Sequence, residues 1–258
     1  AINSPTSNDQ TYAGGIAGRS DRGEIIDVKN SGKINGCTEG RNIKYDLCWT
    51  GGIVGSSFGT DISNAHNTAD ITANGNRVGG IAGQISDQTK INYSTNKGKI
   101  TGDNWSSLGG IVGYAANKSE LNNLENSGDV TGKKELGGIA GYTTENSWIN
   151  VATNNGKIVS VNVDDENRSY VGGILGYGDP VDVKNAANNA DITGKGSYVG
   201  GIVGGMNSEG KNESVIDNVS NKGVIYSEAD NDENGIFSGG IISSIWNTTI
   251  NNAKNYGR

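Results

Sequence analysis

The chain has 258 residues, of which 33% are hydrophobic, and it contains 42 glycines but only 2 prolines and 1 methionine. This hydrophobic share is low for one large globular core, and the shortage of strong helix formers argues against helical repeats. The net charge is −7 and the Lys and Arg residues form no basic stripe, so we expect no nucleic-acid partner. No apolar run reaches the length of about 18 residues that a membrane span needs, so we expect no direct membrane insertion.

Copies of a Gly-Gly-Ile-x-Gly pattern recur along the whole chain, and the last copy ends in Ser. They begin at Gly14, Gly51, Gly79, Gly109, Gly137, Gly172, Gly200 and Gly239. A short, recurrent spacing of this kind is typical of a solenoid in which each repeat forms one coil. The sequence therefore predicts an all-β fold, a parallel β-solenoid (right-handed β-helix) of eight coils that fills residues 1–258 as a single domain. We also expect this domain to be a fragment of a larger multidomain protein.

Each coil is expected to hold about three short strands, with a recurring Asn at a turn between the second and third. The recurring residues are Asn30, Asn67, Asn96, Asn126, Asn154, Asn188, Asn221 and Asn255. Stacked Asn amides can bond along the column and satisfy turn backbone, so we predict an Asn ladder. We also expect a bend or bulge at Gly-Gly, because the aliphatic residues around it cannot all face inward from a flat strand. Which of them faces the core stays open.

Several segments resemble the GLUG motif repeat, namely LGGIVGY (108–114), LGGIAGY (136–142) and VGGILGY (171–177). The Asn-x-Gly-x-Ile-Thr-Gly type of sequence that follows each of them shares this resemblance. The resemblance covers nearly the whole chain. It implies a β-solenoid in a secreted or surface-anchored bacterial protein, such as an adhesin-like protein or a region beside an immunoglobulin-A-cleaving metallopeptidase. It implies no catalytic residue.

Three insertions between coils leave the same corner of the predicted solenoid. The first holds Cys37 and Cys48, which in an extracellular protein suggest a local disulfide, with two free thiols as the alternative. The other two insertions are acidic, and their carboxylates are Asp164, Asp165, Glu166, Asp230, Asp232 and Glu233. Carboxylates suit calcium, but the spacing matches neither the EF-hand loop nor the nonapeptide repeat that binds calcium. Solvated loops are the alternative, and we expect no required cofactor.

Aromatic residues recur in register beside the Gly-Gly pattern. Tyr114, Tyr142 and Tyr177 follow it, whereas Tyr170, Tyr198 and Phe237 precede it in later coils. Such columns could offer a sugar an apolar face with hydroxyl groups at its rim. The alternative is that these rings cap a thin core.

Catalysis has few candidate residues. His66 is the only histidine, so neither an HExxH zinc site nor another two-histidine ligand set can form. We therefore predict a non-enzymatic binding or adhesion region at the cell surface or in secreted form, which recognises a host glycan or host protein. A structural spacer beside a catalytic domain is the second hypothesis, and a polysaccharide-active enzyme is the third.

Overall fold

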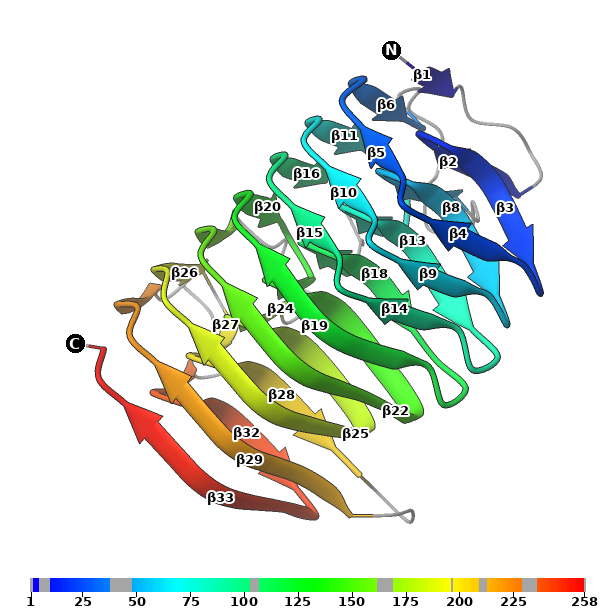
Figure 1. The fold of residues 1–258 in the computed structure, drawn as a ribbon. Coiled ribbons are helices and arrows are strands. Elements are labelled where there is room, and N and C mark those ends of the chain that lie inside the picture. The colour runs from blue at the N-terminus through cyan, green and yellow to red at the C-terminus, as the bar shows by residue number, and fades with distance from the viewer. Residues whose placement is uncertain are drawn as a thin grey trace.

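The chain forms a stack of parallel coils in the computed structural model, from a blue N-terminal coil to a red C-terminal coil (Figure 1). The structure describes residues 2–4, 10–37, 48–102, 107–161, 169–195, 197–208, 213–228 and 236–257. Within these residues all strand pairings are parallel and join equivalent positions of neighbouring coils, as in the pairing of Gly109 with Gly137. The predicted all-β parallel β-solenoid is confirmed.

A coil contributes three to five strands, whereas the sequence predicts about three, and the Gly-Gly pattern separates one strand from the next in every coil. Sheet A contains β1 (Ile2–Ser4), β6 (Ile34–Gly36), β11 (Ile71–Ala73), β16 (Ile100–Gly102), β20 (Val130–Gly132), β23 (Ile158–Ser160), β26 (Ile192–Lys195) and β30 (Ile225–Glu228). Sheet B contains β2 (Thr11–Gly14), β7 (Cys48–Gly51), β12 (Arg77–Gly79), β17 (Ser107–Gly109), β21 (Glu135–Gly137), β24 (Ser169–Gly172), β27 (Ser197–Gly200) and β31 (Phe237–Gly239).

Sheet C has two arms, which follow sheet B along each coil. The first arm contains β3 (Ala17–Asp21), β8 (Val54–Phe58), β13 (Ala82–Ser86), β18 (Val112–Ala115), β28 (Val203–Asn207) and β32 (Ile242–Trp246). The second arm contains β4 (Glu24–Ile26), β5 (Lys29–Asn30), β9 (Asp61–Ser63), β10 (His66–Asn67), β14 (Lys90–Asn92), β15 (Thr95–Asn96), β19 (Glu120–Asn126), β29 (Ser214–Asn221) and β33 (Thr248–Asn255). Two long strands, β22 (Ala140–Asn154) and β25 (Leu175–Asn188), run through both arms and join them into one sheet.

Two hydrophobic cores run along the stack, and the aliphatic residues before and after the Gly-Gly bend face different cores. Val78, before the bend, belongs to the column formed by sheets A and B. Ile81 and Ala82, after the bend, belong to the column formed by the two arms of sheet C. All three side chains are fully buried, so the bend lets every one of them face a core.

The recurring Asn side chains form a continuous ladder along the stack. Each Nδ2 donates to the Oδ1 of the next coil's Asn over 2.8–3.0 Å, from Asn30 to Asn255. In the central coils the same amide also closes its own turn. Asn126 Nδ2 donates to the carbonyl oxygen of Gly128, and Asn126 Oδ1 accepts from the Gly128 amide. The buried amide therefore uses its donors and acceptors in both directions, as a buried polar group must.

The second glycine of each Gly-Gly pair lies against this ladder. A Cβ added at Gly80 would lie 2.4 Å from Asn96 Cγ and 2.1 Å from the carbonyl oxygen of Gly110. Real side chains do not approach this closely, so the recurrence of glycine follows from the Asn column inside the bend.

A second column, three residues before each Asn of the ladder, consists of residues with positive φ. The sequence analysis did not predict it. All its members have φ between 47° and 56°: Asp27, Asn64, Tyr93, Asn123, Val151, Asn185, Asn218 and Asn252. Asn tolerates the left-handed region better than most residues, which explains its recurrence here. Val151 is the β-branched exception.

Candidate functional site

The two groups of aromatic residues predicted from the sequence meet in one continuous feature on the outside of the solenoid. Tyr114, Tyr142 and Tyr177 occupy one register position of the first arm of sheet C. Tyr170, Tyr198 and Phe237 occupy one register position of sheet B. The two columns touch where the Tyr170 and Tyr177 ring centroids lie 4.6 Å apart. We define the aromatic band as Tyr12, Trp49, Arg77, Tyr114, Tyr142, Tyr177, Tyr170, Tyr198 and Phe237.

The rings of the band change orientation along its length. The Tyr142 centroid lies 5.3 Å from that of Tyr114 and 5.4 Å from that of Tyr177, with interplanar angles of 79° and 64°. The Tyr198 ring instead stacks on Tyr170 and Phe237 at 4.9 Å, with angles of 22° and 8°. The tilted part of the band therefore presents both ring faces and hydroxyl-bearing edges, whereas the stacked part presents mainly edges.

The band belongs to neither hydrophobic core. Tyr114, Tyr142 and Tyr177 are half-buried and lie outside both core clusters. Burial increases toward Tyr198, which is 7% exposed, and then falls at Phe237, which is 46% exposed. The rings therefore shield one another, and the accessible surface of the band lies mainly on its half-buried tyrosines and on Phe237.

Arg77 joins the N-terminal and central parts of the band. Its guanidinium carbon lies 3.7 Å from the Tyr114 ring centroid and 5.5 Å from that of Trp49. Trp49 in turn lies against Tyr12, with centroids 5.0 Å apart. A guanidinium between two rings is a favourable cation–π arrangement, and the side chain also donates to Gln84 Oε1.

The tyrosines at the centre of the band are poor acids. Burial raises the pKa of Tyr142, and the neighbouring Tyr114, Asp179, Glu135 and Tyr177 raise it further. Burial also raises the pKa of Tyr114, although Arg77 opposes this rise. These phenol groups therefore remain neutral hydrogen-bond donors and acceptors at physiological pH.

Two polar residues lie in the sheet B column between Arg77 and Tyr170. Ser107 donates its hydroxyl to Glu135 Oε2. The Glu135 side chain is 13% exposed and its Oε1 lies 3.7 Å from Lys134 Nζ. Glu135 also interacts electrostatically with Arg77 and Tyr114. The centre of the band thus combines aromatic rings with one carboxylate and one guanidinium.

A pocket of about 280 Å³ opens at the C-terminal part of the band. Its lining includes Tyr177, Tyr198, Asn207 and Trp246, and the Asn207 side chain hydrogen-bonds to Tyr177. The pocket depends on Gly205, because a Cβ there would lie 2.6 Å from Tyr170 Cδ1. Aromatic walls with one amide are suited to a small polar ligand that has an apolar face.

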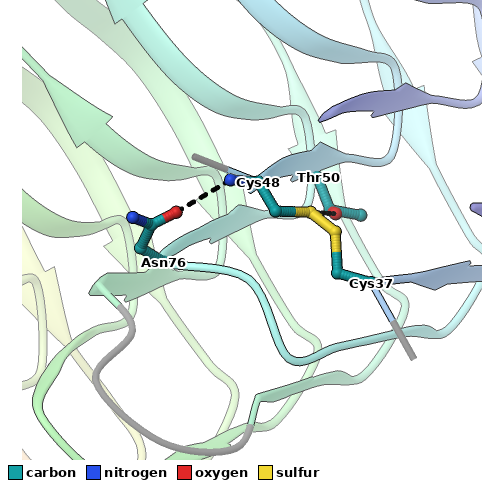
Figure 2. Close-up of a disulfide and its surroundings, with 4 residues drawn as sticks. All are labelled: Cys37, Cys48, Thr50 and Asn76. Atoms are coloured by element: carbon teal, nitrogen blue, oxygen red, sulfur yellow. Dashed lines mark hydrogen bonds between the residues drawn. A yellow bond between two sulfur atoms is a disulfide. The ribbon is translucent and has the colours of Figure 1, made fainter. Parts of the chain in front are cut away.

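Cys37 and Cys48 form a disulfide that closes the first insertion (Figure 2). Both residues are buried. The Cys48 backbone N–H donates to Asn76 Oδ1 over 3.0 Å, which ties the bridge to the next coil. The bond therefore links the end of β6 in sheet A to the start of β7 in sheet B, one residue before Trp49 of the band.

Of the remaining candidates, only His66 lies in the part of the chain that the structure describes. His66 Nδ1 lies 2.8 Å from Thr95 Oγ1 and its Nε2 lies 2.7 Å from Asn64 Oδ1, which are contacts of a surface residue. The calcium candidates lie outside the described residues: Asp164, Asp165, Glu166, Asp230, Asp232 and Glu233. Over the described ranges, no group of three or more His, Cys, Asp or Glu residues could hold a metal ion.

Sequence reasoning missed Tyr12, Trp49, Arg77 and Glu135 as members or neighbours of the band. All four stand two residues before a Gly-Gly pair, the position that Tyr170 shares. Their residue types differ, so an interpretation based on recurring aromatic residues could not find them. Alignment of the repeats by position would have done so.

Comparison with protein-family models, with curated proteins and with solved structures found no match. In the part of the chain that the structure describes, no helix is long and apolar enough to cross a membrane. The resemblance to the GLUG motif repeat stays a prediction.

Proposed function

We propose that this chain is a non-enzymatic binding region that holds a glycan along the aromatic band, as part of a secreted or surface-anchored protein. The observation that carries the proposal is the continuous band itself. It combines half-buried tyrosine rings, neutral phenol groups, the Arg77 guanidinium and the nearby Glu135 carboxylate.

The chemistry of the band suits a sugar. Tyrosine rings offer an apolar surface for the C–H face of a pyranose, and their hydroxyls can bond to its hydroxyl groups. Glu135 can accept hydrogen bonds from neighbouring sugar hydroxyls, whereas Arg77 can donate to them. Neighbouring rings are closer than the repeat of a sugar chain, so the ligand would lie across the band, with the pocket at Tyr177 and Asn207 as a further contact.

The disulfide supports the proposed location. A buried bridge between Cys37 and Cys48 is typical of proteins that fold in an oxidising compartment. The same feature is compatible with the spacer hypothesis, since a rigid, cross-linked stack would also separate domains outside the cell.

The test is a glycan-array screen of the 258-residue chain, followed by calorimetric titration of the strongest hit. Replacing Tyr142 by Ala should lower affinity roughly 10- to 100-fold, the effect of losing a central aromatic contact. Tyr226→Ala is the matched control, because Tyr226 is an exposed tyrosine on sheet A, away from the band. Equal losses in both variants would contradict the aromatic band as the binding site, whereas no array signal would favour the spacer hypothesis.

A further inference from the structure

The turn between the two arms of sheet C is shorter in the sixth coil, which contains β25, than in the coils before it. In the third, fourth and fifth coils this turn holds a pair of residues with φ between 52° and 64°, namely Asp87 and Gln88, Asn117 and Lys118, and Glu145 and Asn146. The sixth coil has Pro180 at this place, and β25 passes there from the first arm to the second without a positive-φ residue. Strands β22 and β25 lie side by side (Figure 1). Thr144 pairs with Asp179 and Ser147 pairs with Val181, so the sixth coil is one residue shorter than the fifth between these pairs.

A recess of about 510 Å³ opens beside this shortened turn. Its volume lies in the range of roughly 300–1,000 Å³ that small-ligand sites occupy. The lining comes from β22 of the fifth coil, from β25 of the sixth coil and from the residue before β29 in the seventh coil. We call it the Trp148 recess and define it by the lining residues that are exposed or partly exposed, namely Asn146, Trp148, Asn150, Asp182, Lys184 and Glu213.

Trp148 lies outside both hydrophobic cores. The residues on either side of it, Ser147 and Ile149, are buried, so the alternation of the strand directs the Trp148 side chain outward. Its register neighbours are Glu120 in the fourth coil and Asp182 in the sixth. A large indole ring among polar residues, at the side of a recess, is suited to contact a ligand that has an apolar face.

The polar side chains of the recess are held in place by contacts of their own. Asp182 Oδ2 lies 2.8 Å from Lys184 Nζ, and Asp182 Oδ1 accepts from the Val215 backbone N–H over 3.0 Å. Asn150 Oδ1 accepts from Asn185 Nδ2 over 2.8 Å. An ammonium group has three donors, so Lys184 can also donate to a ligand. The recess therefore presents positioned donors and acceptors beside an indole ring.

These groups match the chemistry of a neutral sugar. A pyranose has an apolar C–H face, which stacks on an aromatic ring, and hydroxyl groups that both donate and accept. Asp182 and Lys184 lie side by side as acceptor and donor, so they can bond to two neighbouring hydroxyls of one ring. A cation is a poorer match, because the Lys184 ammonium repels it and Asp182 is already paired.

We propose that the Trp148 recess binds a neutral saccharide, at a site separate from the aromatic band. The band lies on sheet B and on the first arm of sheet C, whereas the recess lies at the second arm and the turn before it. The inference goes beyond the proposed function and does not rest on it, because the two sites share no residue.

Nuclear magnetic resonance of the 258-residue chain tests the proposal through the indole N–H signal of Trp148, which is assigned by its loss in Trp148→Thr. The probes are the methyl glycosides of glucose, galactose, mannose, N-acetylglucosamine and N-acetylgalactosamine, with arginine amide as a cationic probe. We expect at least one glycoside to shift this signal saturably and arginine amide to leave it unchanged. A shift by arginine amide alone, or by none of the probes, would overturn the proposal.

The variant Tyr142→Ala separates this inference from the proposed function. The same glycoside should shift the Trp148 signal in this variant as it does in the parent chain, because Tyr142 belongs to the band. Loss of the shift in Tyr142→Ala would contradict a separate site. Failure of the proposed function would instead appear as unchanged array binding in Tyr142→Ala, with the Trp148 shift still present, which supports the recess.

Two substitutions in the recess locate the bound sugar. Saturation-transfer measurements observe the glycoside itself, so they also work in variants that lack Trp148. Trp148→Thr should weaken binding of the strongest glycoside at least about 10-fold, as the loss of a central aromatic contact does. Lys184→Met keeps an unbranched side chain but removes the donor, and it should weaken binding at least about threefold.

Glu120→Thr is the matched control. Glu120 occupies the register position of Trp148 one coil earlier but does not line the recess, so this variant should bind like the parent chain. Because polar residues occupy this register position in both neighbouring coils, Trp148→Thr should fold, and its circular dichroism spectrum should match that of the parent chain. Unchanged binding in Trp148→Thr and Lys184→Met, or an equal loss in Glu120→Thr, would overturn the proposal.

Discussion

The buried Asn ladder and the exposed aromatic band are both columns made by the same coil register, yet they differ in how much they vary. The ladder keeps Asn in every coil, because each amide bonds to both neighbouring rungs and to its own turn. The sheet B position that the band follows instead changes from Trp49 to Arg77 to Ser107 to Glu135 to Tyr170. The buried ladder tolerates no other residue, because each of its members must hydrogen-bond to its neighbours. The outward-facing column has no such requirement and is free to acquire binding chemistry.

The largest effect should come from breaking the ladder. Asn126→Ala removes the rung between Asn96 and Asn154 and leaves the Gly128 turn without its side-chain partner. We expect a loss of about 3 kcal/mol in the free energy of unfolding, because several buried polar groups lose a partner at once. Urea denaturation measures this loss. Asn122→Ala, on the outer side of the same strand, is the control and should change stability by less than about 0.5 kcal/mol.

A substitution in the band should affect stability less than it affects binding. Tyr142→Ala removes ring contacts with Tyr114 and Tyr177 but opens no cavity in either core. We expect a stability loss of about 1–2 kcal/mol, in line with the loss of aromatic pairs. Thermal melting measures it, and a loss as large as that of Asn126→Ala would show that the band is part of the core after all.

The column of positive-φ residues three positions before the ladder varies more than the ladder and less than the band. Substitution of Val151 in this column should increase stability. A β-branched residue at φ 53° is strained, whereas the equivalent Asn123 and Asn185 are well suited to this conformation. Val151→Asn should therefore stabilise the fold by about 1 kcal/mol. The control is Val159→Asn, at an ordinary strand position of sheet A, which should be neutral or destabilising. A loss of stability in Val151→Asn would contradict the assignment of strain.

The pH dependence of stability should report the burial of the band. The pKa of Tyr142 is raised in the folded state, so the unfolded chain loses this proton first as the pH increases. The corresponding contribution to stability is fully present below about pH 10, the ordinary tyrosine pKa, and is lost above it. Denaturation at increasing alkaline pH should show a smaller decline for Tyr142→Phe than for the parent chain. Identical declines would mean that Tyr142 titrates alike in both states.

The sequence by itself determined the solenoid, its eight coils and the Asn ladder. Those features repeat because each residue packs on its equivalent one coil away. The same residue types therefore recur at the spacing of one coil, which is visible in the sequence. The break between two strands at the Gly-Gly pattern was less visible, because Gly15 and its equivalents lie against Asn30 and its equivalents, which are distant in sequence.

Only the tertiary structure decided the composition of the candidate site. Arg77 and Tyr114 belong to different sheets and different coils, and their contact exists because the Gly-Gly bend turns the outer faces of sheet B and the first arm toward each other. Tyr170 and Tyr177 lie in the same coil but in different sheets, and they meet across the same bend. Periodicity identifies which residues share a column. The angle between the outward columns of sheet B and of the first arm depends on how the Gly-Gly bend packs around the ladder, and the repeat pattern does not specify that angle.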